Sequence, residues 1–405
     1  MIVRKSFKFR LKPSDDQMQK MHEYCGHCRF LWNKLLSMNL ERLENKHKLI
    51  WYREADYFSK LWKESNEYGF LKEAPAHCLQ QKMKDLDKAF KDAFDKKQPL
   101  KRLPKFKSRG LSDSFRFPEP KHIQIENRRI KLPKLGWMGF YKSQSIEGTI
   151  KNATVSRREG KWSISIQVEQ EVNQQFHPEN GAVGIDFGIK KFVACSHGSY
   201  FDPVNVFKKS QTKLAKAQRH LSKKKKFSEN WKKQKRKIQK IHSKICNIRR
   251  DFHHKLSTNL SKKHAMIVTE GLKISNMGKS ARDTIEKPGK NVRAKSGLNR
   301  AILDQGWSEF KRQLKYKLEW LGGVYVEVNP SYTSQKCSSC SNIDKKSRIS
   351  QSKFCCMSCE YTENADINAA KNILAEGHSV LACGEDALAV SMKQEPLNMG
   401  DLVSA

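Results

Sequence analysis

The sequence predicts a multidomain α+β protein, because its 405 residues change pattern twice. Residues 14–97 repeat apolar side chains at helical spacing, whereas 98–175 alternate apolar and polar residues in short segments bounded by turn residues. From residue 181 onward, short apolar strands are separated by long helices, which is typical of a mixed sheet with helices on its faces. A chain of this length can bury two or three separate cores.

The formal charge of +37 indicates a protein that binds a polyanion. It results from 79 Lys and Arg against 42 Asp and Glu, far more than solubility requires, and nucleic acid is the simplest such partner. The chain has no apolar run of about 18 residues, and its first residues, MIVRKSFKFRLK, alternate like a strand rather than a signal peptide. We therefore expect no membrane partner, and a reducing cytoplasm as the location of the eleven cysteines.

The amino end predicts a strand followed by an inserted helical domain. Residues 1–13 alternate like a basic strand and are of the right type to complete the sheet or barrel formed by 98–175. Residues 14–97 would then be an insertion. Turns within the sheet are expected near three residues: Asn127, Gly136 and Gly160.

A CxxC lies in the first predicted helix. Cys25 and Cys28, with His22 and His27 nearby, could form a zinc knuckle. The segment is continuously helical and no second cysteine pair follows it, so we favour a packed helix face.

A basic loop follows the helical segment. The stretch KKQPLKRLPKFKSRG has no helical period and is interrupted by Pro and Gly. Such a loop can simply be solvated, but in a chain this basic we favour contacts with phosphates. The candidates are Lys101, Arg102, Lys105, Lys107 and Arg109.

Residues 201–264 predict a helical hairpin that breaks near 226–230. Its second arm carries an apolar seam with Lys and Arg on the other faces, which we interpret as a nucleic-acid-binding wall rather than a solvated face. Residues 279–296 are basic and poorly patterned, as in a flexible lid, and 298–321 predict one helix. A last helix begins near Asp366 and is expected to stop at Gly377.

Three carboxylates stand at the ends of elements in this half of the chain. Asp186 ends the first strand of VGIDFGIKKFVA, Glu270 ends the strand of AMIVTEGL, and Asp366 opens a helix in ENADINAAKNILAEG. Each alone has an ordinary explanation as a turn cap, a surface acid or an acid favoured by the helix dipole. The element order allows all three to reach one edge of a mixed sheet, where they would repel each other without cations. Two Mg²⁺ ions about 3.5–4 Å apart would satisfy them and catalyse phosphodiester hydrolysis.

Four cysteines form two CxxC pairs: Cys337, Cys340, Cys356 and Cys359. The fifteen residues between the pairs match the spacing of a four-thiolate zinc ribbon. Free thiols or disulfides are the alternative; the spacing favours Zn²⁺, and a structural role follows because four thiolates leave no open position. The adjacent Cys355 could compete with Cys356, although the spacing prefers Cys356.

These motifs together resemble a known family. TSQKCSSC, FCCMSC and ADINAAKNI, after GIDFG and VTEGL, are similar to the TnpB family of insertion-sequence proteins, relatives of the type V CRISPR effectors. The similarity covers 181–376 and extends to CRFLWNKLL near the amino end. It implies a RuvC nuclease domain of RNase H-like fold with a zinc-ribbon insertion, preceded by a β-barrel wedge domain with an inserted helical recognition domain. It also implies that Asp186, Glu270 and Asp366 are the catalytic, Mg²⁺-binding acids.

The resemblance implies the following domain boundaries. The wedge domain consists of residues 1–13 and 98–175, and the recognition domain consists of residues 14–97. The nuclease domain consists of residues 181–332 and 363–376. The zinc-ribbon insertion, which binds target nucleic acid, spans residues 333–362, and a flexible tail spans residues 377–405.

The sequence departs from the family pattern at three positions. Ser341 and Glu360 stand where the family usually has Gly after each cysteine pair, and a positive φ there would cost about 1 kcal/mol each. Ala365 replaces an Arg that often precedes the last acid. Arg348, between the cysteine pairs, could approach the scissile phosphate instead.

We therefore expect a monomeric, RNA-guided, Mg²⁺-dependent DNA endonuclease of a transposable element, with structural Zn²⁺, a guide RNA and double-stranded target DNA as partners. Two other functions remain open: a non-cleaving RNA-guided regulator and a transposase that joins DNA strands. Cleavage that is lost in Asp186→Ala would distinguish a nuclease from the non-cleaving regulator. Analysis of the DNA products, as simple breaks or joined strands, would distinguish a nuclease from the transposase.

Overall fold

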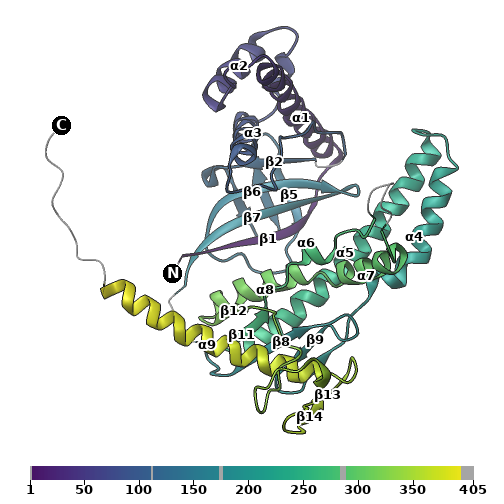
Figure 1. Cartoon of the computed structure of the whole chain (residues 1–405). Helices are drawn as coiled ribbons and strands as arrows, with labels where there is room; N and C mark the ends of the chain where they lie inside the picture. Colours follow the sequence, from purple (N-terminus) through teal and green to yellow (C-terminus); the bar gives the residue numbers. More distant parts are fainter. Residues whose placement is uncertain (1, 111–112, 173–176, 283–288, 394–405) are drawn as a thin grey trace. The chain divides into compact units, whose positions relative to one another are not determined.

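The computed structural model describes residues 2–110, 113–172, 177–282 and 289–393. The chain forms two compact units, Met1–Asn173 (unit 1) and Gln174–Ala405 (unit 2) (Figure 1). Both units combine helices with a sheet, as expected of an α+β protein.

Unit 1 is built on an antiparallel sheet of seven strands in the order β2-β6-β7-β1-β5-β4-β3. The strands are β1 (Ile2–Lys12), β2 (Ser114–Phe117), β3 (Gln124–Glu126), β4 (Arg129–Leu132), β5 (Gly136–Tyr141), β6 (Thr149–Arg158) and β7 (Lys161–Glu171). The amino-terminal strand β1 pairs with β7 and β5, so it completes the sheet as expected. Strands β2 and β3 end the order and are not paired with each other in the described part of the chain, so strand pairing leaves an open sheet rather than a closed barrel.

Three helices lie between β1 and β2: α1 (Asp15–Glu44), α2 (Tyr52–Glu64) and α3 (Ala76–Phe94), with a short 3₁₀ turn, η1 (Gly69–Lys72). A capping box starts α1, because the Ser14 hydroxyl accepts from the backbone N–H of Gln17 while the Gln17 side chain accepts from that of Ser14. Cys25 and Cys28 are buried on the inner face of α1. The CxxC is therefore a packed helix face, as we favoured.

Unit 2 contains a five-stranded mixed sheet in the order β10-β9-β8-β11-β12. The strands are β8 (Ala182–Phe187), β9 (Val193–Cys195), β10 (Tyr200–Phe201), β11 (Met266–Glu270) and β12 (Val324–Val328). Strands β8, β11 and β12 are parallel, whereas β9 is antiparallel to β8. The carboxyl ends of β8 and β11 therefore lie at the same edge of the sheet.

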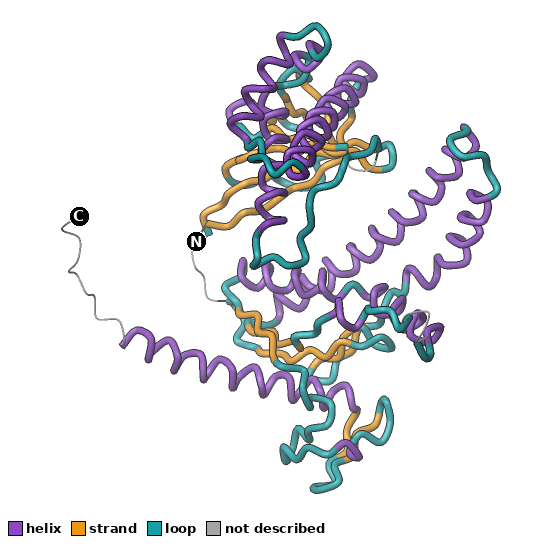
Figure 2. Tube along the Cα trace, turned by 45° about the horizontal axis from the view of Figure 1, so that its top comes forward, coloured by secondary structure: helices purple, strands orange, loops and turns teal. Residues whose placement is uncertain are grey.

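In the part of unit 2 that the structure describes, six helices accompany this sheet: α4 (Val206–Ser222), α5 (Glu229–Lys263), α6 (Ile274–Met277), α7 (Val292–Gln305), α8 (Trp307–Trp320) and α9 (Ala365–Lys393). One face of the sheet packs against α5 and α8 through residues such as Ile185, Leu256 and Phe310. The other face packs against α9 through Val268 and Ile373 (Figure 1). Helices α4 and α5 run side by side as an antiparallel hairpin, with the break where the sequence predicted it (Figure 2).

The structure corrects two helix boundaries. The helix predicted over 298–321 is two helices, because Gly306 adopts φ +69° between α7 and α8. The last helix does not stop at Gly377 but continues to Lys393. Gly377 lies within α9 and faces the sheet, where a Cβ would collide with Val268. The glycine therefore allows the helix to pack closely on the sheet and does not end it.

Two further expectations fall partly outside the described residues. The proposed lid includes 283–288, and its carboxyl end forms the start of α7. Residues 394–405 of the predicted tail are likewise outside the description. None of the described helices combines the length and the apolar character needed to cross a membrane.

Candidate functional site

Asp186 and Glu270 share one face and one edge of the unit 2 sheet. Strands β8 and β11 pair in parallel with Thr269 opposite Ile185, so the next residues, Glu270 and Asp186, stand side by side at the carboxyl ends. Side chains alternate along a strand, and Val183 and Ile185 face α5 and α8. Asp186 therefore faces the side covered by α9, as does Glu270, two residues after the α9-facing Val268.

Asp366 reaches this edge from the first turn of α9. Its backbone N–H donates to the Asn364 side chain, which caps the start of the helix at 2.9 Å. Gly184 allows α9 to approach the sheet, because a Cβ there would collide with the backbone carbonyl of Ala370. Gly184 in GIDFG thus sets how closely α9, which carries Asp366, can approach Asp186.

Two of the acids act electrostatically on the third, Asp186. Burial, followed by the charges of Glu270 and Asp366, raises the pKa of Asp186 to about 7, against the opposing effect of Arg348 and the Phe187 backbone N–H. Burial also raises the pKa of Asp366, where Arg348 and Lys190 oppose it. The carboxylate oxygens are less tightly grouped than the thiols described below, because no three acidic side chains in the described part of the chain have oxygens within 4.8 Å of one another.

Glu270 is held by its surroundings. It is 9% exposed, and burial raises its pKa although the Thr333 hydroxyl donates to Glu270 Oε1 at 2.5 Å. Lys311 Nζ donates to the backbone carbonyl of Glu270 at 3.0 Å and to Glu327 Oε2 at 2.8 Å. Lys311 thus holds the backbone of Glu270, while the charge of its ammonium group is paired with the Glu327 carboxylate.

Oxygen donors of this kind suit a hard cation. Two carboxylates that raise the pKa of a third gain from a divalent ion, since the ion removes the repulsion that burial amplifies. Asp186, Glu270 and Asp366 therefore fit Mg²⁺ by donor type and by charge.

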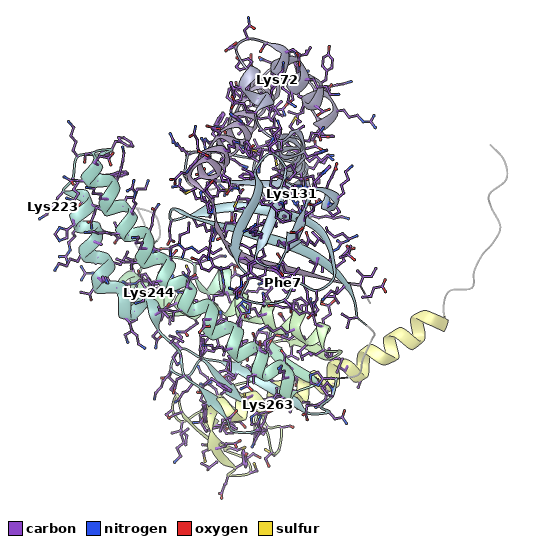
Figure 3. All side chains as sticks on the ribbon, turned by 180° about the vertical axis from the view of Figure 1, so that it is seen from behind. Phe7, Lys72, Lys131, Lys223, Lys244 and Lys263 are labelled. Carbon is purple, nitrogen blue, oxygen red and sulfur yellow. The ribbon has the colours of Figure 1, made fainter. Side chains whose placement is uncertain are left out.

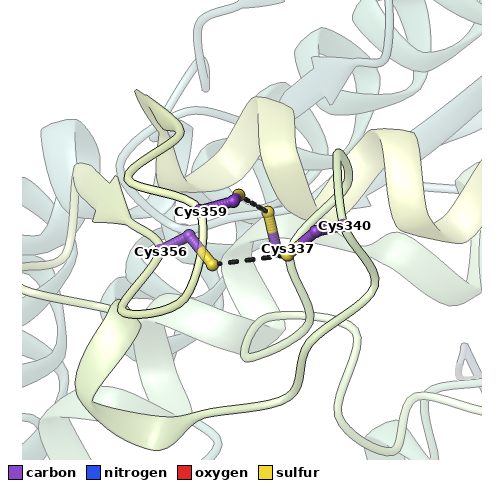
Figure 4. A group of neighbouring side chains, drawn as sticks. All are labelled: Cys337, Cys340, Cys356 and Cys359. Atoms are coloured by element: carbon purple, nitrogen blue, oxygen red, sulfur yellow. Dashed lines mark hydrogen bonds between the residues drawn. The ribbon is translucent and has the colours of Figure 1, made fainter.

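The four cysteines of the two CxxC pairs converge in residues 333–362, which we call the cysteine loop (Figure 4). Cys337 Sγ lies 3.7 Å from Cys359 Sγ, and Cys340 Sγ lies 3.6 Å from Cys356 Sγ. A tetrahedral zinc with Zn–S bonds of about 2.3 Å places its sulfurs about 3.8 Å apart, so the thiols are spaced for that ion. Apart from η3 (Lys345–Ser347), β13 (Lys353–Cys355) and β14 (Thr362–Asn364), the loop has little regular structure (Figure 2).

The thiols also resist ionising together. Backbone N–H groups of Cys359 and Ser358 lower the pKa of Cys356 to about 6. The backbone N–H of Tyr361 acts in the same direction on Cys359, yet its neighbouring thiols raise its pKa to about 12. A bound cation would relieve this conflict, because it stabilises all four thiolates at once.

The two departures from glycine do occupy the left-handed region. Ser341 has φ 63° and Glu360 has φ 58°. Each N–H donates back to the first cysteine of its pair, Ser341 to the Cys337 carbonyl at 3.0 Å and Glu360 to the Cys356 carbonyl at 3.1 Å. The turns therefore keep their form, at a cost of roughly 1 kcal/mol each.

Two asparagines on α9, which are not among the predicted site residues, anchor the cysteine loop. Asn368 accepts from the Ser338 N–H at 2.9 Å and donates to the Lys336 carbonyl at 2.8 Å. Asn372 donates to the Thr333 carbonyl at 2.9 Å. Their four-residue spacing in ADINAAKN places both on one face of the helix, which was the available signal.

Arg348 of the cysteine loop lies beside Asp366, with 3.8 Å between Nη2 and Oδ1. The other predicted contacts belong to unit 1, where Lys101, Arg102, Lys105 and Arg109 are exposed. Lys107 differs from them, because its Nζ lies 3.5 Å from the centre of the Trp32 ring and burial lowers its pKa to about 8.

The backbone of this basic loop is fixed to α1. Trp32 Nε1 donates to the Lys105 carbonyl at 3.0 Å. Asn33 donates to the Lys107 carbonyl at 3.0 Å and accepts from its N–H at 2.8 Å. The loop is therefore a held platform with exposed cations rather than a freely solvated segment. In unit 2, Lys223, Lys244 and Lys263 mark the exposed basic surface of the α4–α5 hairpin (Figure 3).

Comparison with known proteins identifies the family. Over 395 residues the chain is 51% identical to a protein of Escherichia coli (strain K12) named "Putative RNA-guided DNA endonuclease InsQ", covering 97% of this chain and 98% of the relative. The chain belongs to the TnpB family. A TnpB relative from Streptomyces pristinaespiralis, named "Putative RNA-guided DNA endonuclease", is 30% identical over 95% of this chain and 92% of its own length.

Family models match three parts of this TnpB chain. Residues 165–281, with Asp186 and Glu270, match "Probable transposase", and 307–373, with Asp366 and the cysteine loop, match "Cas12f1-like, TNB domain". Residues 1–48 match "Helix-turn-helix domain", although this structure has β1 and the uninterrupted α1 there. A solved Cas12f1–sgRNA–target DNA complex is similar at 17% identity with a TM-score of 0.33, covering 92% of this chain and 99% of that one.

Proposed function

We propose that this chain is an RNA-guided, Mg²⁺-dependent DNA endonuclease of a transposable element, which cuts target DNA beside a short flanking motif. One observation carries the proposal: carboxylates from β8, β11 and α9 meet closely enough that burial and the other two acids raise the pKa of Asp186 to about 7. The names of the two relatives that match nearly the whole chain support the same activity.

In this proposal, Asp186, Glu270 and Asp366 hold two Mg²⁺ ions. When bound, such ions activate water and stabilise the leaving oxygen in phosphodiester hydrolysis. The raised pKa of Asp186 means that the unloaded acid is partly protonated near neutral pH and releases this proton on binding.

The neighbouring side chains have positioning roles. The Thr333 hydroxyl orients the Glu270 carboxylate, and Lys311 fixes the backbone of the same residue. Arg348, 3.8 Å from Asp366, supplies positive charge at the edge where a phosphate would enter. Zn²⁺ on the four thiolates would be structural, because it leaves no open position and fixes the loop that carries Arg348 and Thr333.

We further propose the domain roles. Residues 181–332 and 363–376 form a RuvC-like nuclease domain, with 333–362 as its zinc-ribbon insertion. Residues 1–13 and 98–175 form the wedge and 14–97 the recognition domain. Exposed Lys101, Arg102, Lys105 and Arg109 would contact nucleic-acid backbone together with the α4–α5 hairpin. One copy of the chain would act with one guide RNA, while base pairing selects the target.

The test begins with the RNA. The chain is expressed with its native flanking DNA, and the RNA that copurifies with it is sequenced. A discrete RNA with a constant scaffold and a variable end is expected, whereas a smear of cellular RNA would refute guidance. The complex is then assayed on matching linear DNA with Mg²⁺ or EDTA, with Asp186→Asn and, as a control, exposed Asp251→Asn.

We expect double-strand breaks that need Mg²⁺ and fall by more than about 100-fold in Asp186→Asn, with Asp251→Asn unchanged. Tight target binding without cleavage in the wild type would instead establish a regulator. Joined DNA products in place of simple breaks would establish a strand-transfer transposase.

A further inference from the structure

A second group of metal-ligating side chains lies in unit 1, far along the sequence from the cysteine loop. It consists of His77, Glu119 and His122, whose ligand atoms all lie within 4.8 Å of one another. His77 Nδ1 is 3.3 Å from Glu119 Oε1, and His122 Nε2 is 3.3 Å from Glu119 Oε2. The two imidazole rings are roughly parallel, at 28°, with their centroids 6.1 Å apart.

Local structure places these residues together. Glu119 directly precedes and His122 ends a single 3₁₀ turn, η2 (Pro120–His122), in which residues three apart lie on the same side. His77 is in the first turn of α3, and the sheet and α3 share one core. The cluster therefore joins a helix of the inserted segment to the connection between β2 and β3.

The central carboxylate has unused binding capacity. Glu119 Oε2 is shielded from solvent and accepts no hydrogen bond of good geometry, although Lys121 Nζ and His122 Nε2 lie 3.4 and 3.3 Å away. Both contacts are long for an ion pair, so a closer partner would improve on them. A cation coordinated by this oxygen and by both imidazoles would satisfy it.

We propose that His77, Glu119 and His122 bind a transition-metal cation of the Zn²⁺ class. Two imidazoles and a carboxylate are a donor set that Zn²⁺ takes, with the fourth position left to water. Tetrahedral zinc places such donors roughly 3.3 Å apart, close to the distances of His77 Nδ1 from Glu119 Oε1 and of His122 Nε2 from Glu119 Oε2, and small side-chain rotations would bring the three ligand atoms, already within 4.8 Å of one another, onto one ion. The side chains are 43%, 35% and 46% exposed, so the ion can enter from solvent and a water can complete the site. Bound metal would tie α3 to η2 and stiffen unit 1.

The experiment uses the full-length chain without a histidine tag, prepared with one equivalent of zinc on its cysteines as measured by mass spectrometry. Co²⁺ is titrated in while the visible spectrum is recorded, because Co²⁺ on nitrogen and oxygen donors lacks the thiolate charge-transfer bands that Co²⁺ on cysteines shows. The variants are His77→Ala/His122→Ala, the single His122→Ala, and a control that removes two exposed histidines elsewhere, His47→Ala/His242→Ala.

We expect wild type and the control to bind one further equivalent of Co²⁺ without thiolate bands. The double variant should lose that equivalent, and His122→Ala should bind it at least tenfold more weakly. Circular dichroism verifies that each variant is folded. If the double variant does not fold, the comparison of His122→Ala with wild type provides the test. Absence of a further equivalent in wild type would overturn the proposal, as would its retention in both variants. Neither result bears on DNA cleavage, so this proposal and the nuclease function fail separately.

Discussion

Arg348 Nη2 lies 3.8 Å from Asp366 Oδ1, so a side chain of the cysteine loop reaches the acid that begins α9. The guanidinium lowers the pKa of Asp186, Glu270 and Asp366, against the burial that raises them. The geometry of the cysteine loop and the ionisation of the acids are therefore linked through one residue.

Replacing Arg348 should move the pH profile of cleavage. In Arg348→Ala the three carboxylates lose a neighbouring cation and their pKa values rise, so more protons must leave before Mg²⁺ binds. The acidic limb of the rate-against-pH curve should shift to higher pH. Lys345→Ala, an exposed change in the same loop, is the control. An unshifted curve in Arg348→Ala would separate this residue from the acids.

Thr333→Val tests the support of Glu270. The substitution keeps the shape of the side chain but removes the hydroxyl that donates at 2.5 Å to Glu270 Oε1. Loss of a hydrogen bond to a metal-binding carboxylate costs about 10–100-fold in activity or metal affinity. Cleavage rates measured over a range of Mg²⁺ concentrations should show this loss, whereas exposed Thr149→Val should not. Equal rates in the two variants would contradict the positioning role.

The adjacent cysteines offer a matched pair for zinc. Cys356 belongs to the four-thiol group, whereas Cys355 lies on β13 outside it. Cys356→Ser should lose one equivalent of zinc and unfold the cysteine loop, and Cys355→Ser should retain both zinc and stability. Zinc content by mass spectrometry and thermal unfolding measure the two effects. Zinc loss in Cys355→Ser instead would reverse the ligand assignment.

Gly184→Ala tests the close approach of α9. The added methyl would collide with the Ala370 carbonyl, so α9 must shift and carry Asp366 with it. We expect a loss of about 1–3 kcal/mol in the free energy of unfolding, together with reduced cleavage. Gly297→Ala adds the same methyl in the interior of α7, where nothing lies within 4 Å, and should be neutral or stabilising. The unfolding midpoints of the two variants make the comparison.

His253 predicts how stability depends on pH. The residue is 1% exposed among aromatic rings, donates from Nε2 to the Gln305 carbonyl at 2.8 Å, and burial lowers its pKa to about 4. In the unfolded chain this histidine has a pKa near 6.5, so between about pH 6.5 and 4 it binds a proton that the folded chain does not bind. The contribution of neutral His253 to the free energy of unfolding is therefore fully present above about pH 6.5 and is lost as the pH falls toward 4.

The loss should approach about 3 kcal/mol at the acidic end of this range. His253→Gln can keep a donor for the Gln305 carbonyl without titrating, so its unfolding midpoint should vary less with pH than that of wild type. A variant at the exposed His242, His242→Gln, should follow wild type. Identical slopes for all three proteins would show that another group controls the acid response.

The parts of the fold that depend on local pattern were predictable from the sequence. Asn127, Gly136 and Gly160 all adopt positive φ at the expected turns, and alternation located the strands on either side. The cysteine pairs were found by spacing because chelation restricts how far apart ligands can be. The ends of β8 and β11 were predictable because each strand is a short apolar run with an acid, Asp186 or Glu270, at its end.

Tertiary contacts determined what the sequence could not predict. Gly377 was interpreted as a helix end, yet its missing side chain makes room for Val268. Gly306 has the opposite role and divides a periodic segment into two helices. His77 and His122 are 45 positions apart by number and meet through the packing of α3, which no local spacing reveals.

Asp366 is also the last of the three acids to be synthesised, in the helix that covers the second face of the unit 2 sheet. A chain still on the ribosome, or one cut short before this helix, has an open core and two acids without the third. If the three act together as proposed, an unfinished product cannot hydrolyse DNA even when its basic surfaces already bind nucleic acid. Translation order would thus protect the host cell from partial copies of the enzyme.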